Sequence, residues 1–141
     1  RSDFLSNFLL EIITPEKQFY KGEVEAITCQ TDDGELGILK GHQTMIAALK
    51  IGEIKIKING DWKFAFVSEG FMEVRPDEVM IFSQACEWPE DIDEARAEQA
   101  RQHALENIRH EQGIREHRNN EITLARAMTR LKVKRHYLNQ I

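Results

Sequence analysis

The sequence lacks a long hydrophobic run: its apolar stretches fall far short of the ~18 consecutive residues that a membrane-spanning helix needs. We therefore expect no direct membrane insertion. Cysteines are few, since Cys29 and Cys86 stand alone without a CxxC pair, which argues against a metal or redox centre and favours two buried free thiols. An excess of positive charge is also missing. The net charge of −5 and pI near 5.6 make nucleic acid an unexpected partner.

Proline and glycine are nearly absent from the C-terminal third. Residues 90–141 contain no proline and one glycine, whereas residues 1–89 hold all three prolines, seven of the eight glycines and ten of the eleven aromatic residues. Downstream of Pro89 the apolar residues and alanines recur with a period near 3.6, which is typical of amphipathic helices. The sequence therefore predicts a β domain over residues 1–88, followed by an α-helical hairpin domain over residues 89–141.

Short alternating segments separated by turn signals fill the first domain, and their spacing indicates a β-sandwich or barrel. The expected strands are Leu9–Ile13, Val24–Thr31, Met45–Leu49, Ile51–Ile58, Trp62–Val67, Phe71–Arg75 and Val79–Gln84. One hairpin can be placed in register. An odd loop of about three residues, Asn59 to Asp61, would pair Ile58 with Trp62 and so keep the apolar side chains on one face. Gly60 is then expected at positive φ.

Residues 34–42, GELGILKGH, hold three glycines but match neither a P-loop nor a dinucleotide-binding motif. We expect a surface loop with tight turns here, not a nucleotide site. No Ser or Cys nucleophile motif accompanies His42, so a structural or interface role is favoured over catalysis.

In the second domain, Asp91 is the expected N-cap of the first helix, with Glu94 completing a capping box. Gly113 is the expected break between two helices of about 20 residues, each roughly 30 Å long. The stripes expected to pack the arms antiparallel are Ile92, Ala95, Ala100, Ala104 and Ile108 on the first arm, and Leu124, Met128, Leu131 and Leu138 on the second, with Ala125 and Ala127 beside the second stripe.

Three arginines are candidates for an anion site. A turn near Gly113 would put Arg96 level with about residue 130, while Arg126 and Arg130 share a face at i, i+4. Guanidinium groups brought together need anions between them, either carboxylates such as Glu87 or a polyphosphate. From their spacing alone, the three arginines could instead be solvated surface residues that form no anion site. Histidines 103, 110 and 117 lie seven residues apart, about 10 Å of helical rise, which is too far for one metal site.

Three segments in this order resemble the epsilon subunit of the bacterial F-type ATP synthase: GELGILKGH, Glu69–Val74 and Ile92–Ala97, ahead of an alanine-rich hairpin. The resemblance covers essentially the whole chain. The family usually has proline at the positions of Lys40 and Thr44, and a second glycine at that of Glu69. The resemblance implies a ten-stranded β-sandwich followed by a two-helix hairpin, with no active site of its own.

The resemblance further implies a rotor subunit of the central stalk, peripheral at the cytoplasmic face of the bacterial cell membrane. It would couple ion flow to ATP synthesis through the gamma subunit and the c ring, with Asp32, Asp33, Glu35 and His42 at the interface. Its hairpin would either fold onto the sandwich or extend toward the alpha and beta catalytic subunits and block ATP hydrolysis.

In some bacterial members ATP binds the folded hairpin as a regulatory ligand, and we expect no metal requirement. The residues that match that motif are Glu87, Ile92, Asp93, Arg96, Ala97, Arg126 and Arg130. At a further basic position of the family this chain has His103, whose neutral imidazole would weaken phosphate contact. Without the resemblance, the alternative interpretation is a non-catalytic β-sandwich binding module with a helical protein-interaction tail.

Overall fold

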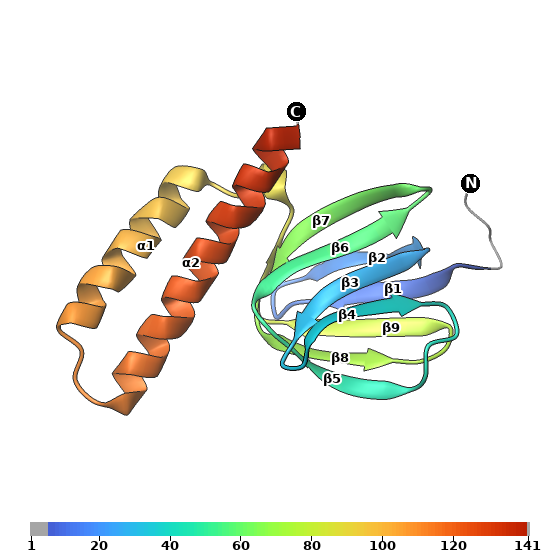
Figure 1. Ribbon diagram of the computed structural model, residues 1–141, viewed down its shortest axis with the longest axis horizontal. Helices are drawn as coiled ribbons and strands as arrows, with labels where there is room; N and C mark the ends of the chain where they lie inside the picture. Colours follow the sequence, from blue (N-terminus) through green and yellow to red (C-terminus); the bar gives the residue numbers. More distant parts are fainter. Residues whose placement is uncertain (1–5, 141) are drawn as a thin grey trace. The chain divides into compact units, whose positions relative to one another are not determined.

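The computed structural model describes residues 6–140 and divides the chain into two compact units, the first ending at Glu87 and the second beginning at Trp88. The first unit is a β-sandwich of ten strands within the described residues, and the second is a pair of helices (Figure 1). The predicted fold class, a ten-stranded β-sandwich followed by a helical hairpin, is confirmed. Within residues 6–140, neither helix has the length of apolar sequence that a membrane span requires.

The strands of the first unit form one continuous hydrogen-bonded sheet in the order β10-β7-β6-β3-β5-β8-β9-β1-β2, with β4 paired to β3. Their bounds are β1 (Phe8–Ile13), β2 (Gln18–Val24), β3 (Ala26–Thr31), β4 (Gly34–Leu39), β5 (Met45–Leu49), β6 (Gly52–Ile58), β7 (Asp61–Val67), β8 (Gly70–Val74), β9 (Glu78–Ser83) and β10 (Cys86–Glu87). The β1–β9 pair is parallel and the other pairs are antiparallel.

The sheet folds into two layers at β3. One edge of β3 pairs with β6 through its first three residues and touches β5 only where Thr31 faces Leu49. Strict burial alternation in β1 and β9 sends every second side chain into the interior, as a two-layer core requires. In the buried core, the Cys29 Sγ of β3 lies 3.9 Å from the Met72 Sδ of β8. This contact joins the two layers.

Both cysteines are free and buried, as predicted. Burial raises the pKa of the Cys29 thiol to about 12, and it raises that of Cys86 to about 11. Neither thiol is therefore ionised near neutral pH, and both behave as small apolar side chains.

The glycine-rich segment expected as a surface loop is instead strand β4, so that expectation was wrong. All six residues of β4 pair with β3, and Ile38 opposite Ile27 is buried. The glycines hid an alternation in which Ile38 points inward while Gly37 and Leu39 are exposed. Strands β2 and β10 were also missed, because β2 is polar and β10 has only two residues.

The turn between β6 and β7 has two residues, not the expected odd loop. Asn59 and Gly60 both have positive φ, 50° and 83°, as a type I′ turn requires. Ile58 consequently faces Asp61, and Lys57 faces Trp62.

The register argument failed because it assumed that only one face of β7 is buried. In fact Phe64, Ala65, Phe66 and Val67 are all buried, so both faces of this end of the strand are covered. Alternation then gives no preference between registers, and the turn residues decide.

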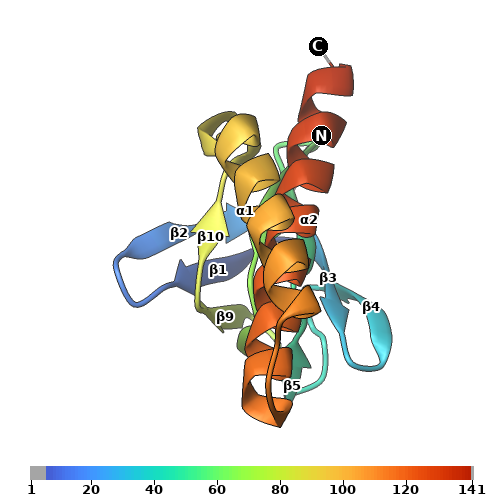
Figure 2. The same ribbon diagram turned by 90° about the vertical axis from the view of Figure 1, so that its left-hand side faces the viewer.

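The second unit contains a short 3₁₀ helix η2 (Pro89–Asp91), then α1 (Glu94–Arg109) and α2 (Ile114–Gln140). The two helices lie side by side and run antiparallel in both views (Figures 1 and 2). Gly113, at φ 86°, ends the turn between them, as predicted. The arms are not of equal length as expected: 16 and 27 residues correspond to about 24 Å and about 41 Å.

The first helix begins later than expected. Asp91 belongs to η2, and the N-cap is Asp93, whose Oδ1 accepts a hydrogen bond from the Arg96 N–H at 3.0 Å. Pro89 is the first residue of the 3₁₀ helix. Asp91, which the capping-box pattern had selected as the N-cap of α1, is therefore the last residue of that 3₁₀ helix.

The stripes that pack the arms agree only in part with those expected, since Ile92, Ala104 and Leu131 are buried as predicted. Met128 and Leu138 are exposed, as is Ala95. The residues buried in the second unit are Pro89, Ile92, Ala97, Ala104, Asn120, Ala127, Leu131 and Val133. Three of these eight are alanines, and their small side chains allow the two arms to approach closely.

Candidate functional site

The segment from Ile92 to Ala97 joins η2 to α1, and most of its side chains have a structural role. Ile92 and Ala97 are buried, at 3% and 4% exposure. Asp93 caps α1 through the Arg96 backbone. The Arg96 side chain is exposed. Of these four predicted site residues, Asp93 and Arg96 are therefore the charged and exposed ones, and Asp93 also caps the helix.

The other predicted arginines, Arg126 and Arg130, lie one turn apart on α2 and are half-buried. Glu87, which we predicted alongside them, pairs with Phe66 in β10 and ends the first unit. His103 is exposed on α1, seven residues after Arg96.

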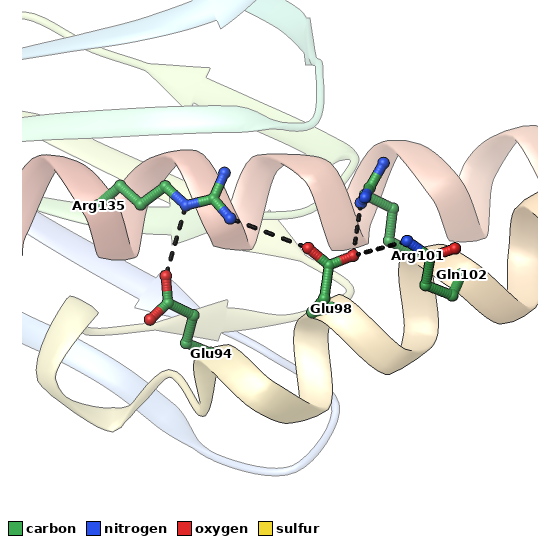
Figure 3. Close-up of polar contacts among 5 residues, drawn as sticks. All are labelled: Glu94, Glu98, Arg101, Gln102 and Arg135. Atoms are coloured by element: carbon green, nitrogen blue, oxygen red, sulfur yellow. Dashed lines mark hydrogen bonds and ion pairs between the residues drawn. The ribbon is translucent and has the colours of Figure 1, made fainter.

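Ion pairs between the two helices show which residues of α1 and α2 lie opposite each other along the hairpin. The Nε of Arg135 lies 3.4 Å from Glu94 Oε2, and its Nη2 lies 3.9 Å from Glu98 Oε1 (Figure 3). Arg135, and not residue 130 as expected, therefore faces the turn of α1 that carries Arg96. Along α2 toward the interhelix turn, Arg130 lies about 7.5 Å and Arg126 about 14 Å beyond Arg135, at 1.5 Å per residue.

Glu98 is the centre of this polar network (Figure 3). Its Oε2 accepts hydrogen bonds from Arg101 Nε at 2.7 Å and from Gln102 Nε2 at 3.2 Å. The Arg101 hydrogen bond is the main reason why the pKa of Glu98 lies below its ordinary value. Sequence reasoning missed the network, although the i, i+3 spacing of Glu98 and Arg101 was a usable signal.

The predicted interface residues lie at the two ends of β4. Asp32 and Asp33 form the turn before the strand and are exposed, as is Glu35 at its start. Thr31 fixes this turn, because its Oγ1 accepts from the Asp33 N–H at 3.2 Å and donates to the Gly34 carbonyl at 2.9 Å.

His42 follows the other end of β4, which is about 17 Å away for a strand of this length. Its Nδ1 lies 2.9 Å from the Gln43 carbonyl oxygen, and the neighbouring Gly41 N–H bonds the Pro76 carbonyl at 2.6 Å. The structure therefore groups the three acidic residues together and places His42 apart from them.

Among residues 6–140, no group of three or more His, Cys, Asp or Glu side chains is arranged to hold a metal ion.

Two sequence families match the chain, one for each unit. Residues 7–89 match the family described as ATP synthase, Delta/Epsilon chain, beta-sandwich domain, and residues 90–135 match its long alpha-helix domain. The chain therefore belongs to the delta/epsilon chain family of ATP synthases.

Within that family, the chain is similar to the ATP synthase epsilon chain of Caldanaerobacter subterraneus subsp. tengcongensis. The two are 46% identical over 131 residues, which cover 92% of this chain and 95% of the relative. This match confirms the predicted resemblance to bacterial epsilon subunits.

Solved structures share the fold. The chain superposes with a TM-score of 0.77 and 21% identity on a chain of the Euglena gracilis mitochondrial ATP synthase, covering 97% of this chain and 84% of that one. A second neighbour, with a TM-score of 0.68 and 15% identity, comes from the Tetrahymena thermophila mitochondrial ATP synthase structure described as central stalk and c-ring. It covers 90% of this chain and 96% of that one.

Proposed function

We propose that this chain is a rotor subunit of the central stalk, which binds the gamma subunit and the c ring and couples ion flow to ATP synthesis. The observation that carries the proposal is the match of both units, sandwich and hairpin, to a bacterial epsilon chain over nearly its full length. The Tetrahymena neighbour, described as central stalk and c-ring, supports it. The protein would then be held at the cytoplasmic face of the cell membrane by its partners and would be non-catalytic itself.

Co-purification tests this proposal. Co-expressed with the gamma subunit of the same organism, the full chain is expected to elute with it as a 1:1 complex. Separate elution of the two proteins would contradict the rotor assignment and favour a free-standing binding module.

For the c ring, the proposed contact is the acidic end of β4. Asp32, Asp33 and Glu35 are exposed on a turn that Thr31 holds in place, so charge reversal there should leave the sandwich folded. Asp33→Lys with Glu35→Lys is expected to lower ATP-driven ion pumping in the assembled complex. Glu16→Lys with Glu23→Lys reverses two charges that are also exposed, elsewhere on the sandwich, and serves as the matched control. Equal pumping by both pairs of variants would exclude this end of β4 as the contact.

We also propose that the hairpin restrains ATP hydrolysis when it extends toward the alpha and beta subunits. Helix α2 carries seven basic residues and two acidic ones. Arg115, Arg118, Lys132 and Arg135 are exposed along it, so an extended arm would be a basic rod suited to an acidic surface.

ATP is the proposed regulatory ligand of the hairpin. Arg96 has an exposed guanidinium, and the half-buried Arg126 and Arg130 lie at i, i+4 on the facing helix, about 14 and 7.5 Å along it from the level of Arg96. A triphosphate bound along the folded arms would neutralise these like charges through charge-assisted hydrogen bonds. Because ATP would bind the folded arms and scarcely the separated ones, it would shift the balance toward folding. His103 replaces a cation of the family site, so weak binding is expected.

Calorimetry on the isolated full chain tests this site. Arg126→Ala should abolish the heat of ATP binding. Arg118→Ala should keep it, because Arg118 is an exposed arginine of the same helix outside the proposed site. No binding by the unaltered chain up to millimolar ATP, or equal binding by both variants, would overturn the ATP proposal while leaving the stalk assignment intact.

A further inference from the structure

A cluster of titratable groups lies at the turn between α1 and α2, outside the surfaces considered so far. His117, in the first turn of α2, stands between two carboxylates. Its Nδ1 lies 2.5 Å from Glu111 Oε1, and its Nε2 lies 3.1 Å from Glu121 Oε1. Glu111 belongs to the interhelix turn, whereas Glu121 lies one helical turn further along α2.

Side-chain hydrogen bonds fasten this turn to α2. The Asn120 Nδ2, on a side chain that is almost fully buried, donates to Glu111 Oε2 at 3.3 Å. The Gln112 N–H donates to Glu116 Oε2 at 2.9 Å. Residues 112–119 are all exposed, and Ile114 at the start of α2 is 77% exposed. Apolar burial therefore contributes little here, and the polar contacts hold the turn.

The geometry around His117 requires a particular protonation state. A carboxylate can only accept hydrogen bonds, and a neutral imidazole has one N–H and one lone pair. Both ring nitrogens of His117 face carboxylate oxygens, so the hydrogen bond to Glu111 and the ion pair with Glu121 are both favourable only when the ring carries two protons. Loss of one proton would turn a nitrogen lone pair toward a negative oxygen.

We propose that Glu111, His117 and Glu121 form a proton-dependent clasp, which ties the interhelix turn to α2 while His117 is protonated and loosens the turn when the proton leaves. The clasp is a property of the hairpin itself and does not depend on ATP or on the stalk partners.

The surrounding charges support this behaviour. On the α1 side of the turn, the ionisable groups are Glu106 and Arg109 of α1 and its C-cap His110, and Glu106 lies 3.7 Å from Arg109 and 3.3 Å from His110. The charged neighbours of His117 on α2 itself are Arg115, Glu116 and Arg118, all of them exposed.

The hydrogen bond to Glu111, and then the charges of Glu111 and Glu121, raise the pKa of His117 above its ordinary 6.5. Partial burial raises the pKa of Glu111, but hydrogen bonds from Asn120 and His117 outweigh it and leave that pKa below 4.5.

The pH window follows from these directions. His117 has a folded-state pKa above its unfolded value, so its contribution is complete below pH 6.5 and is lost as the pH rises through the folded pKa. Glu111 has a depressed folded pKa, so its contribution is complete above pH 4.5 and is lost as the pH falls through the folded value. The clasp is therefore tightest between about pH 4.5 and 6.5 and opens on the alkaline side.

Proton NMR titration of the histidines in the full chain tests the proposal, with the His117 signal assigned by its loss in His117→Gln. We expect a His117 midpoint above 6.5, moved down toward 6.5 by Glu111→Gln. Hydrogen exchange should show several-fold higher protection of residues 110–116 at pH 5.5 than at pH 8.5, after correction for intrinsic rates. His117→Gln should remove that difference. His110→Gln should keep it, because His110, the C-cap of α1, contacts Glu106 of that helix and neither carboxylate of the clasp.

A His117 midpoint at or below 6.5 would overturn the clasp, and so would a midpoint unmoved by Glu111→Gln. The same holds if His117→Gln keeps the pH dependence of protection. The midpoint is measured on the unaltered chain, so the test does not depend on how well a variant folds.

Discussion

Gly70 begins β8 at a point where the backbone of β9 leaves no room for a side chain. A Cβ at this position would lie 1.8 Å from the carbonyl oxygen of Phe82. Gly70→Ala must therefore push the two strands apart, and overpacking of this kind costs about 1–3 kcal/mol. Denaturant unfolding of the full chain, followed by tryptophan fluorescence, should show a lower free energy of unfolding.

Gly37→Ala is the matched control for Gly70, because Gly37 is exposed in β4 and an added Cβ meets no atom within 4 Å. This change should stay within about 0.5 kcal/mol of the unaltered chain. If both variants lost the same stability, the β8–β9 approach would not be the cause.

The burial of a single residue was predictable where the residue type has a strong preference for the interior. The two cysteines were expected to be free and buried from their spacing and strand-like neighbours, and they are. The closeness of β9 to Gly70 was not predictable, because it depends on a pairing between strands that sequence spacing alone does not specify.

Among the structural elements, α1 depends on a single side chain for its start. Asp93 accepts the Arg96 N–H, and replacing such an N-cap by alanine costs about 0.5–2 kcal/mol. Asp93→Ala should therefore reduce the helical signal of the chain and lower its thermal midpoint, as read by far-UV circular dichroism. Asp93→Asn retains a capping oxygen and should lose much less.

Asp91→Ala distinguishes this cap from the one expected by pattern. Asp91 is exposed in η2, so its removal should have little effect on α1. A larger loss from Asp91→Ala than from Asp93→Ala would show that the helix starts earlier than the structure indicates.

The ion pairs of Arg135 link α2 to α1 and stabilise the packing of the two helices. Because Arg135 and Glu94 are both substantially exposed, at 59% and 43%, their coupling should be small, about 0.2–1 kcal/mol. A double-mutant cycle with Arg135→Gln and Glu94→Gln measures it through thermal unfolding, and the coupling should shrink in high salt. Lys132→Gln, an exposed cation on the same helix, should not couple to Glu94→Gln; coupling of equal size would mean a general charge effect.

Sequence pattern predicted the existence and type of the long elements better than their limits. The hairpin and most of the strands follow from periodicity, because burial of one face imposes it. Pattern failed at β4, where glycines masked the alternation, and at the β6–β7 turn, where both faces of β7 are buried. The residue of α2 that lies opposite Arg96 was predicted wrongly. Apolar residues and alanines continue through both arms, so the sequence does not show that the two helices differ in length.

At the scale of the whole molecule, the chain consists of two compact units, each with its own buried residues. The core that joins β3 to β8 lies entirely within the first unit. A chain that ends after Pro89 should therefore keep a folded sandwich, with strand-type circular dichroism and a cooperative thermal transition.

The same truncation tests the inhibitory role proposed for the hairpin. A complex with the truncated chain would lack α2 and its seven basic residues, and it should hydrolyse ATP several-fold faster than the complete complex.

An intermediate rise in the rate of ATP hydrolysis, larger at low salt, is expected when Arg115 and Arg118 are both changed to glutamine. An electrostatic contact weakens with each exposed charge that is removed, and it is screened by ions. The gamma subunit must be shown to co-purify with each variant. Unchanged hydrolysis by a truncated complex that still contains gamma would mean that this hairpin does not restrain the enzyme, and any inhibition would then have to come from the sandwich.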